Sequence, residues 1–190
     1  NKNRLDALSP IVDSLHLDNF YYLRDNGLYE IGDCVFNVMS VFNDPEDYIL
    51  SKNIKTDKTT IALYHGSVEN ATTDVGFKLP GEVTTDIFSG YDMVLLGDIH
   101  KQQYLNKQKT IAYAGSLVCQ NWGEHPTNHG YIKWDAPKRK PEYRIIENDY
   151  AYVTLEVENG KVVNEIPLPK YPRMRIKVCK TEESQLKKIL

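Results

Sequence analysis

"YDMVLLGDIH", residues 91–100, places an acid and a histidine directly after a short apolar run. A continuous apolar run of this length is typical of a strand that is covered on both faces. The stretch "TTIALYHG", residues 59–66, has the same form and ends in a histidine. In open α/β sheets, binding groups collect at the carboxyl ends of the strands. The two stretches therefore predict neighbouring strands that carry His65, Asp98 and His100 to one edge of a sheet.

Imidazole nitrogens and carboxylate oxygens together suit divalent ions such as manganese, iron, zinc or magnesium. Gly66 and Gly97 have no side chain and allow a close approach of the backbone. Each candidate ligand also has a simpler interpretation, because a single histidine at a strand end is often a polar cap. The pair Gly97–Asp98 could only start a turn. Three candidate ligands on two strand ends leave both the metal site and the structural caps open.

Length and composition exclude several classes of protein. The chain has 190 residues, 41% of them hydrophobic, which predicts one main globular domain. No apolar run approaches the ~18 residues that a membrane span needs, and the net charge of −3 is unlike that of a dedicated nucleic-acid binder. The three cysteines Cys34, Cys119 and Cys179 are widely spaced, which argues against a disulfide framework and against a thiolate zinc site. We expect a reducing location, cytoplasmic or nuclear, and not secretion.

Further patterns predict mostly strands outside these two stretches. Apolar residues three and four apart predict a short helix near residues 4–15, bent at Pro10. Turn signals at Asn26–Gly27 and Gly32–Asp33 predict a β-hairpin or meander. The later strands are expected within residues 109–118, 129–134, 143–148, 152–163 and 173–179, before a helix that starts near Thr181.

A family resemblance extends the prediction. The segments "LYHG", "LLGDIHKQQYL", "IAYAGSLVCQNWGE" and "HGYIKW" resemble the second half of a calcineurin-like metallophosphoesterase. They are most similar to the SbcD-type nucleases of DNA double-strand-break repair, whose pattern there is a lone histidine, then G-H-x-H, then Y-x-G-S and a glycine. The resemblance covers residues 59–135.

The resemblance implies a fold and a domain division. Residues 1–168 would form the C-terminal part of an α/β metallophosphoesterase-type two-sheet sandwich flanked by helices. Residues 169–190 would begin a small α+β capping domain that is cut short. The family's earlier D-x-H, G-D-x-x-D and G-N-H-D/E motifs do not occur in this sequence, which indicates a fragment that lacks the N-terminal metal motifs.

The resemblance also implies a role for each matching residue. His65 would bind the second of two divalent ions and His100 the first, with manganese foremost and magnesium, iron or zinc as alternatives. Asp98 stands where the family has a histidine, so it could ligate a metal or be silent. The histidine that assists the leaving group would lie upstream, which leaves no catalytic residue in this chain.

Three further residues are candidates for substrate binding. His125 lies in a loop that is near the substrate in the resembling nucleases. Lys138 and Arg139 belong to the densest basic cluster of the sequence and could contact a phosphate backbone. A solvated loop is the alternative for the cluster.

The implied activity is hydrolysis of DNA phosphodiester bonds by a metal-dependent nuclease, with exonuclease and endonuclease action in DNA repair and recombination. The implied partners are DNA and an SMC-like ATPase subunit of the SbcC type, or a second copy in a homodimer, and no membrane. This chain alone would be incomplete for catalysis. The alternatives are a phosphoesterase that acts on a nucleotide or a phosphoprotein, and a non-catalytic DNA-binding or scaffold subunit whose metal site has eroded.

Overall fold

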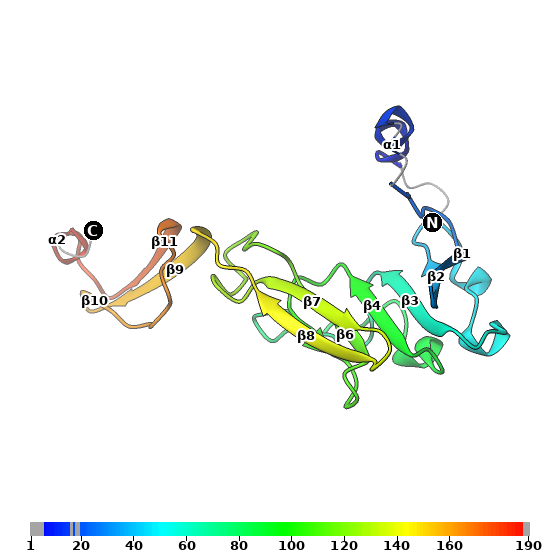
Figure 1. Cartoon of the computed structure of the whole chain (residues 1–190). Coiled ribbons are helices and arrows are strands. Elements are labelled where there is room, and N and C mark those ends of the chain that lie inside the picture. The colour runs from blue at the N-terminus through cyan, green and yellow to red at the C-terminus, as the bar shows by residue number, and fades with distance from the viewer. Residues whose placement is uncertain (1–5, 16, 18–19, 188–190) are drawn as a thin grey trace.

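A computed structural model describes residues 6–15, 17 and 20–187 of the chain. Its strands succeed one another along one long axis in a β-solenoid-like arrangement (Figure 1). The α-helices and strands are α1 (Ser9–Leu15), β1 (Gly27–Ile31), β2 (Cys34–Met39), β3 (Thr59–His65), β4 (Met93–Gly97), β5 (Gln103–Tyr104), β6 (Ile111–Tyr113), β7 (Gly130–Asp135), β8 (Lys140–Ile145), β9 (Tyr150–Glu158), β10 (Lys161–Val162), β11 (Tyr171–Cys179) and α2 (Glu183–Leu186). Three 3-10 helices join them: η1 (Pro45–Asp47), η2 (Ser51–Asn53) and η3 (Thr85–Phe88).

The largest sheet has six strands in the order β1-β2-β3-β4-β6-β5. The inner pairs β2–β3, β3–β4 and β4–β6 are parallel, while β1–β2 and β5–β6 are antiparallel. The predicted hairpin is confirmed, because β1 and β2 pair across the turn between Ile31 and Cys34. β7 and β8 form a separate two-stranded sheet, and β9 lies between β10 and β11 in a third.

The core lies around β3 and β4, the two apolar stretches of the sequence analysis. Ala62 and Met93 have no exposed surface, which confirms that both stretches are buried strands. The main buried cluster combines residues of β2, β3, β4 and β6 with residues of the connection between β3 and β4: Met39, Ala62, Tyr64, Val68, Ala71, Phe88, Tyr91, Val94, Leu96, Ile111 and Tyr113. The connection therefore covers one face of the sheet where an α/β protein would place a helix.

The predicted α/β metallophosphoesterase-type sandwich flanked by helices is wrong. The described part of the chain is predominantly β, with far more residues in strands than in helices. The connection between β3 and β4 contains only the four-residue η3, and elsewhere it makes the isolated bridges Val68–Val83 and Thr72–Lys78. Its glycines at positions 76, 81 and 90 all have positive φ, a conformation that does not occur inside a right-handed helix. The helix α1 buries none of its residues, so it covers no face of a sheet.

The sheet of β9, β10 and β11 has two different faces. β9 and β11 pair in parallel over nine residues each. Residues at alternate positions share a face, so Arg173, Arg175 and Lys177 lie beside the polar residues of β9. Val153 and Val157 on the opposite face are buried. Among the described residues, no strand pairs with the outer side of β11.

The predicted boundary between residues 168 and 169 falls just before β11 and stays a prediction. Part of the predicted helix near residues 4–15 lies outside the described residues, and its remainder contains α1. Over residues 6–15, 17 and 20–187, no helix is long and apolar enough to cross a membrane.

Candidate metal centre

The carboxyl ends of β3 and β4 form the edge at which the candidate ligands meet. The two strands are parallel, and His65, the last residue of β3, pairs with Gly97, the last residue of β4. The chain then continues directly into Asp98 and His100. Parallel pairing in this register brings the ends of both strands to the same edge, as the sequence predicted.

His65 and Asp98 lie next to each other at this edge. Their atoms Nε2 and Oδ1 are 3.9 Å apart, and the side chains are 67% and 47% exposed. Gly97 makes room for the imidazole, because a Cβ at this position would lie 2.6 Å from Nδ1 of His65. Asp98 has a φ of 96°, which is rare for a residue with a side chain and costs on the order of 1–3 kcal/mol. Such strain is concentrated at functional sites.

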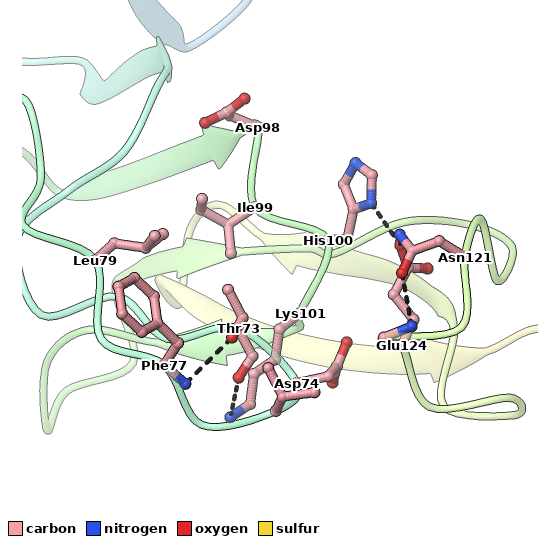
Figure 2. Close-up of a pocket in the computed structure, with 12 residues that line it drawn as sticks. Thr73, Asp74, Phe77, Leu79, Asp98, Ile99, His100, Lys101, Asn121 and Glu124 are labelled. Carbon is pink, nitrogen blue, oxygen red and sulfur yellow. Dashed lines mark hydrogen bonds and ion pairs between the residues drawn. The ribbon is translucent and has the colours of Figure 1, made fainter. Parts of the chain in front are cut away.

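His100 does not join this pair. Its Nδ1 lies 2.8 Å from Oε1 of Glu124, and Figure 2 shows the imidazole turned toward Glu124, with Asp98 on a different part of the pocket wall. The Glu124 side chain is only 5% exposed, and its Oε2 accepts a hydrogen bond from the Gln120 backbone amide at 2.8 Å. The structure thus divides the predicted ligands between two neighbouring groups.

A pocket of about 510 Å³ has residues of both groups in its lining, although His65 does not line it (Figure 2). Asp98, His100 and Glu124 all line it, together with Lys101. The Lys101 ammonium donates a hydrogen bond to Thr72 Oγ1 at 3.0 Å, so this cation is held at the pocket wall. The apolar part of the lining consists of Val75, Phe77, Leu79 and Ile99. Carboxylates, the His100 imidazole and one ammonium around a hollow of this size suit a small polar or phosphorylated group.

Tyr113 stabilises the backbone that follows His65 at this edge. Its side chain is fully buried, and its hydroxyl donates a hydrogen bond to the Gly66 carbonyl at 2.7 Å and accepts one from the Val68 amide at 2.9 Å. Burial raises the pKa of Tyr113 to about 12. Burial also raises the pKa of Tyr64, and the neighbouring carboxylate of Glu82 raises it further. Both phenols therefore stay neutral, and Tyr113 holds the backbone directly after His65.

The predicted substrate-binding residues lie elsewhere. His125 is exposed, and its Nδ1 accepts a hydrogen bond from the Thr127 amide at 3.3 Å. Lys138 pairs with Asp135 at 3.0 Å, and Arg139 pairs with Asp92 at 2.8 Å.

None of His125, Lys138 and Arg139 lines the pocket. Acidic partners neutralise the two basic residues, so a role for these three in binding substrate stays a prediction without support from the geometry.

Sequence reasoning missed Glu124. It lies in the irregular loop between β6 and β7 and becomes buried only when that loop packs against the residues after β4. An acidic residue in a polar loop gives no periodic signal, and only the neighbouring glycine Gly123 indicated a turn there.

A comparison with known proteins finds a relative in a virus. The chain is 41% identical over 201 residues to "Uncharacterized protein R555" of Acanthamoeba polyphaga mimivirus. The alignment covers 100% of this chain and 15% of that protein, so the chain spans a small part of the relative that it matches. No family model matches the chain.

The resemblance to the calcineurin-like metallophosphoesterases, and to the SbcD-type nucleases among them, is therefore wrong. No model of that family matches, and the predominance of strands does not fit its helix-flanked sandwich. The physical reason is that the matching motifs are short groups of glycine, histidine and small residues at strand ends. Turns after parallel strands favour such residues in many unrelated sheets.

Proposed function

We propose that His65 and Asp98 bind a divalent metal ion and that the protein uses it to hydrolyse phosphodiester bonds in DNA. The observation that carries the proposal is the 3.9 Å separation of His65 Nε2 and Asp98 Oδ1 at the ends of two paired parallel strands. Ligand atoms lie about 2.0–2.2 Å from a bound ion, so His65 Nε2 and Asp98 Oδ1 need to approach each other only slightly to bind the same ion. The rigid strands hold both residues in place for this.

The chemistry of the two side chains supports a catalytic ion. An imidazole nitrogen with a carboxylate oxygen suits manganese, iron or zinc. Both side chains are about half exposed or more, which leaves the remaining coordination positions open to water and to a phosphate oxygen. A bound divalent ion would activate water and neutralise the negative charge that grows on the phosphate during attack. The task of His65 and Asp98 themselves would be to hold the ion at the ends of β3 and β4.

A surface on the third sheet supports DNA as the substrate. Arg173 lies 5.2 Å from the ring centre of Tyr152, and Arg175 lies 5.3 Å from that of Trp122. Within the described part of the chain, neither arginine forms a salt bridge with an acid. Unpaired cations beside aromatic rings are the groups that contact phosphates and stack on bases.

The cysteines support a reducing compartment. Cys34, Cys119 and Cys179 are all free thiols, and free thiols persist where disulfides are kept reduced. We infer a cytoplasmic or nuclear location on this basis.

The test combines metal binding with two cleavage assays. Titration calorimetry with Mn²⁺ is expected to show a site that is lost in Asp98→Asn and in His65→Ala. Cleavage of linear duplex DNA with Mn²⁺ is expected to fall by more than about 100-fold in both variants. Asp57→Asn is the matched control, because Asp57 is an exposed acid that forms no salt bridge in the described part of the chain.

Three outcomes would contradict the proposal. Hydrolysis of p-nitrophenyl phosphate without cleavage of DNA would replace the nuclease with a phosphatase. Mn²⁺ binding without either activity would replace the enzyme with a metal-binding scaffold. Unchanged Mn²⁺ affinity in Asp98→Asn and His65→Ala would remove the metal centre itself.

A further inference from the structure

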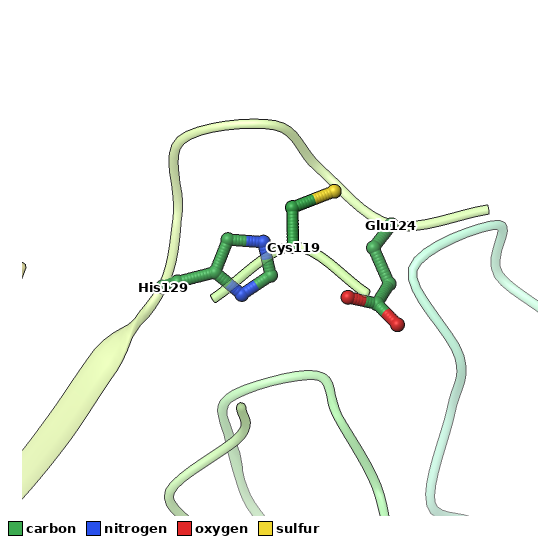
Figure 3. A group of neighbouring side chains, drawn as sticks. All are labelled: Cys119, Glu124 and His129. Atoms are coloured by element: carbon green, nitrogen blue, oxygen red, sulfur yellow. The ribbon is translucent and has the colours of Figure 1, made fainter. Parts of the chain in front are cut away.

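We propose that Cys119, Glu124 and His129 form a second metal site, separate from the pair His65–Asp98, that binds a zinc-like divalent ion. One ligand atom from each of the three residues lies within 4.8 Å of the other two. Figure 3 shows the three side chains as neighbours, with the His129 ring and the Glu124 side chain on either side of Cys119. Thiolate sulfur, imidazole nitrogen and carboxylate oxygen are the ligand types that zinc takes in proteins. This site does not rest on the proposed function.

The three residues follow one another at equal spacing, as C-x₄-E-x₄-H, on a single loop. The loop runs from residue 114 to residue 129, between β6 and β7, and contains no strand or α-helix. Loops of this length without secondary structure of their own are uncommon in compact domains and are often functional. A metal ion held by three of its residues would close the loop on itself and fix its path.

The imidazole of His129 is already oriented for a metal. The residue is 3% exposed. Its Nε2 lies 2.6 Å from the His125 carbonyl oxygen, and its Nδ1 lies 2.9 Å from the Ser116 hydroxyl. Because a carbonyl oxygen can only accept, Nε2 carries the proton and donates it to His125. The Nδ1 lone pair is then the one that would bind the ion, in place of the Ser116 hydroxyl, while the bond from Nε2 holds the ring in place. Metal-binding histidines almost always have such a bond.

The carboxylate of Glu124 is held in the same way. Besides the Gln120 amide on Oε2, its Oε1 is contacted by Asn121 Nδ2 at 2.5 Å and by His100 Nδ1 at 2.8 Å. His100 is thus a positioning residue for Glu124 in this site. Glu124 and His100 also line the pocket of Figure 2, so one residue of the cluster borders that pocket.

The Cys119 thiol has no strong competing interaction. Cys119 is 7% exposed, and its sulfur lies 3.4 Å from the Asn121 carbonyl and 3.8 Å from the Tyr152 carbonyl. Zinc bonds of about 2.0–2.3 Å require the three ligand atoms to approach one another by roughly 1 Å. When the ion binds, the thiol loses its proton to solvent and the resulting thiolate coordinates the metal.

The experiment uses Co²⁺ as a coloured substitute for zinc, because a thiolate–cobalt bond gives an ultraviolet charge-transfer band that oxygen and nitrogen ligands do not give. We expect this band to saturate at one Co²⁺ per chain and to disappear when Zn²⁺ is added. Cys119→Ser should abolish the band, and Glu124→Gln should weaken Co²⁺ binding by about tenfold or more while the thiol remains. Circular dichroism checks that both variants fold.

The controls separate this site from the proposed function. Cys179→Ser removes an exposed thiol and should keep the band, as should His65→Ala and Asp98→Asn, which abolish only the other site. Absence of the band in the unmodified protein at saturating Co²⁺ would overturn the proposal. Equal Co²⁺ affinity in the unmodified protein and in Glu124→Gln would overturn it too, as would loss of the band in Cys179→Ser.

Discussion

Replacing Tyr113 by phenylalanine removes a hydroxyl that holds the backbone after β3, next to the candidate metal centre, and we expect it to destabilise the fold by about 3 kcal/mol. The hydroxyl is the hydrogen-bond partner of the Val68 amide and of the Gly66 carbonyl. Val68 and Tyr113 have no exposed surface, so water cannot replace the lost partner. The benzene ring keeps its packing, and the cost therefore comes from the two backbone groups.

The magnitude follows from these two groups. A buried donor or acceptor that loses its partner costs about 1–3 kcal/mol. The Val68 amide has a single proton to donate, so the loss of its partner should cost an amount near the middle of that range. The Gly66 carbonyl should cost less, because carbonyl oxygens tolerate missing partners better than amides do. The sum is about 3 kcal/mol.

Equilibrium unfolding in urea, followed by tryptophan fluorescence, measures the change. The midpoint should fall while the slope of the transition stays the same. Tyr131→Phe is the matched control, since Tyr131 is 47% exposed, and it should change stability by less than about 0.5 kcal/mol. A loss below about 0.5 kcal/mol in Tyr113→Phe would show that the two hydrogen bonds do not hold the backbone after β3.

Three further predictions follow from the backbone and from burial. Gly97→Ala should weaken Mn²⁺ binding in calorimetry while the far-UV circular dichroism spectrum stays the same, because the new Cβ would lie 2.6 Å from His65 Nδ1 and displace the ring; unchanged affinity would contradict it. Gly115→Ala should lower stability in urea by more than about 2 kcal/mol, because φ is +80° and the Cβ would meet a backbone oxygen at 2.7 Å. Gly32→Ala is its control: φ is +57° but a Cβ there would meet open space, so the loss of stability should be only about 1 kcal/mol. Burial raises the pKa of Tyr113 from 10.0 to about 12, so the folded chain holds this proton more tightly than the unfolded chain does. The contribution of Tyr113 to the free energy of unfolding should therefore be fully present below pH 10 and be lost as the pH rises to about 12. The fall, measured as the urea midpoint, should be smaller in Tyr113→Phe.

The paired strands and the contact between His65 and Asp98 could be predicted from the sequence, because both depend on local patterns. Two continuous apolar runs indicate strands buried on both faces, and parallel pairing then brings the residues after them together. The positive φ of Asp98 could not be predicted, since it results from the path that the chain takes after β4.

The fold class and the second cluster could not be predicted in the same way. Parallel strands usually require helical crossovers, but here the irregular connection between β3 and β4 covers the sheet. The prediction from cysteine spacing excluded a thiolate zinc site, because spacing rules describe pairs of cysteines and not a cysteine with a glutamate and a histidine. Cys119, Glu124 and His129 come together only through the fold of their loop.

The outer side of β11 has a consequence for how the molecule meets its own copies. The amides and carbonyls of this nine-residue strand that point away from β9 have no partner strand among the described residues, and such an edge would ordinarily serve as a template for adding a strand from another molecule. Pro172 has no amide to donate, and Arg173, Arg175 and Lys177 place like charges along the strand. A second β11 that approached in register would bring these cations opposite one another. These residues therefore disfavour self-association through the outer edge of β11, although the strand is long.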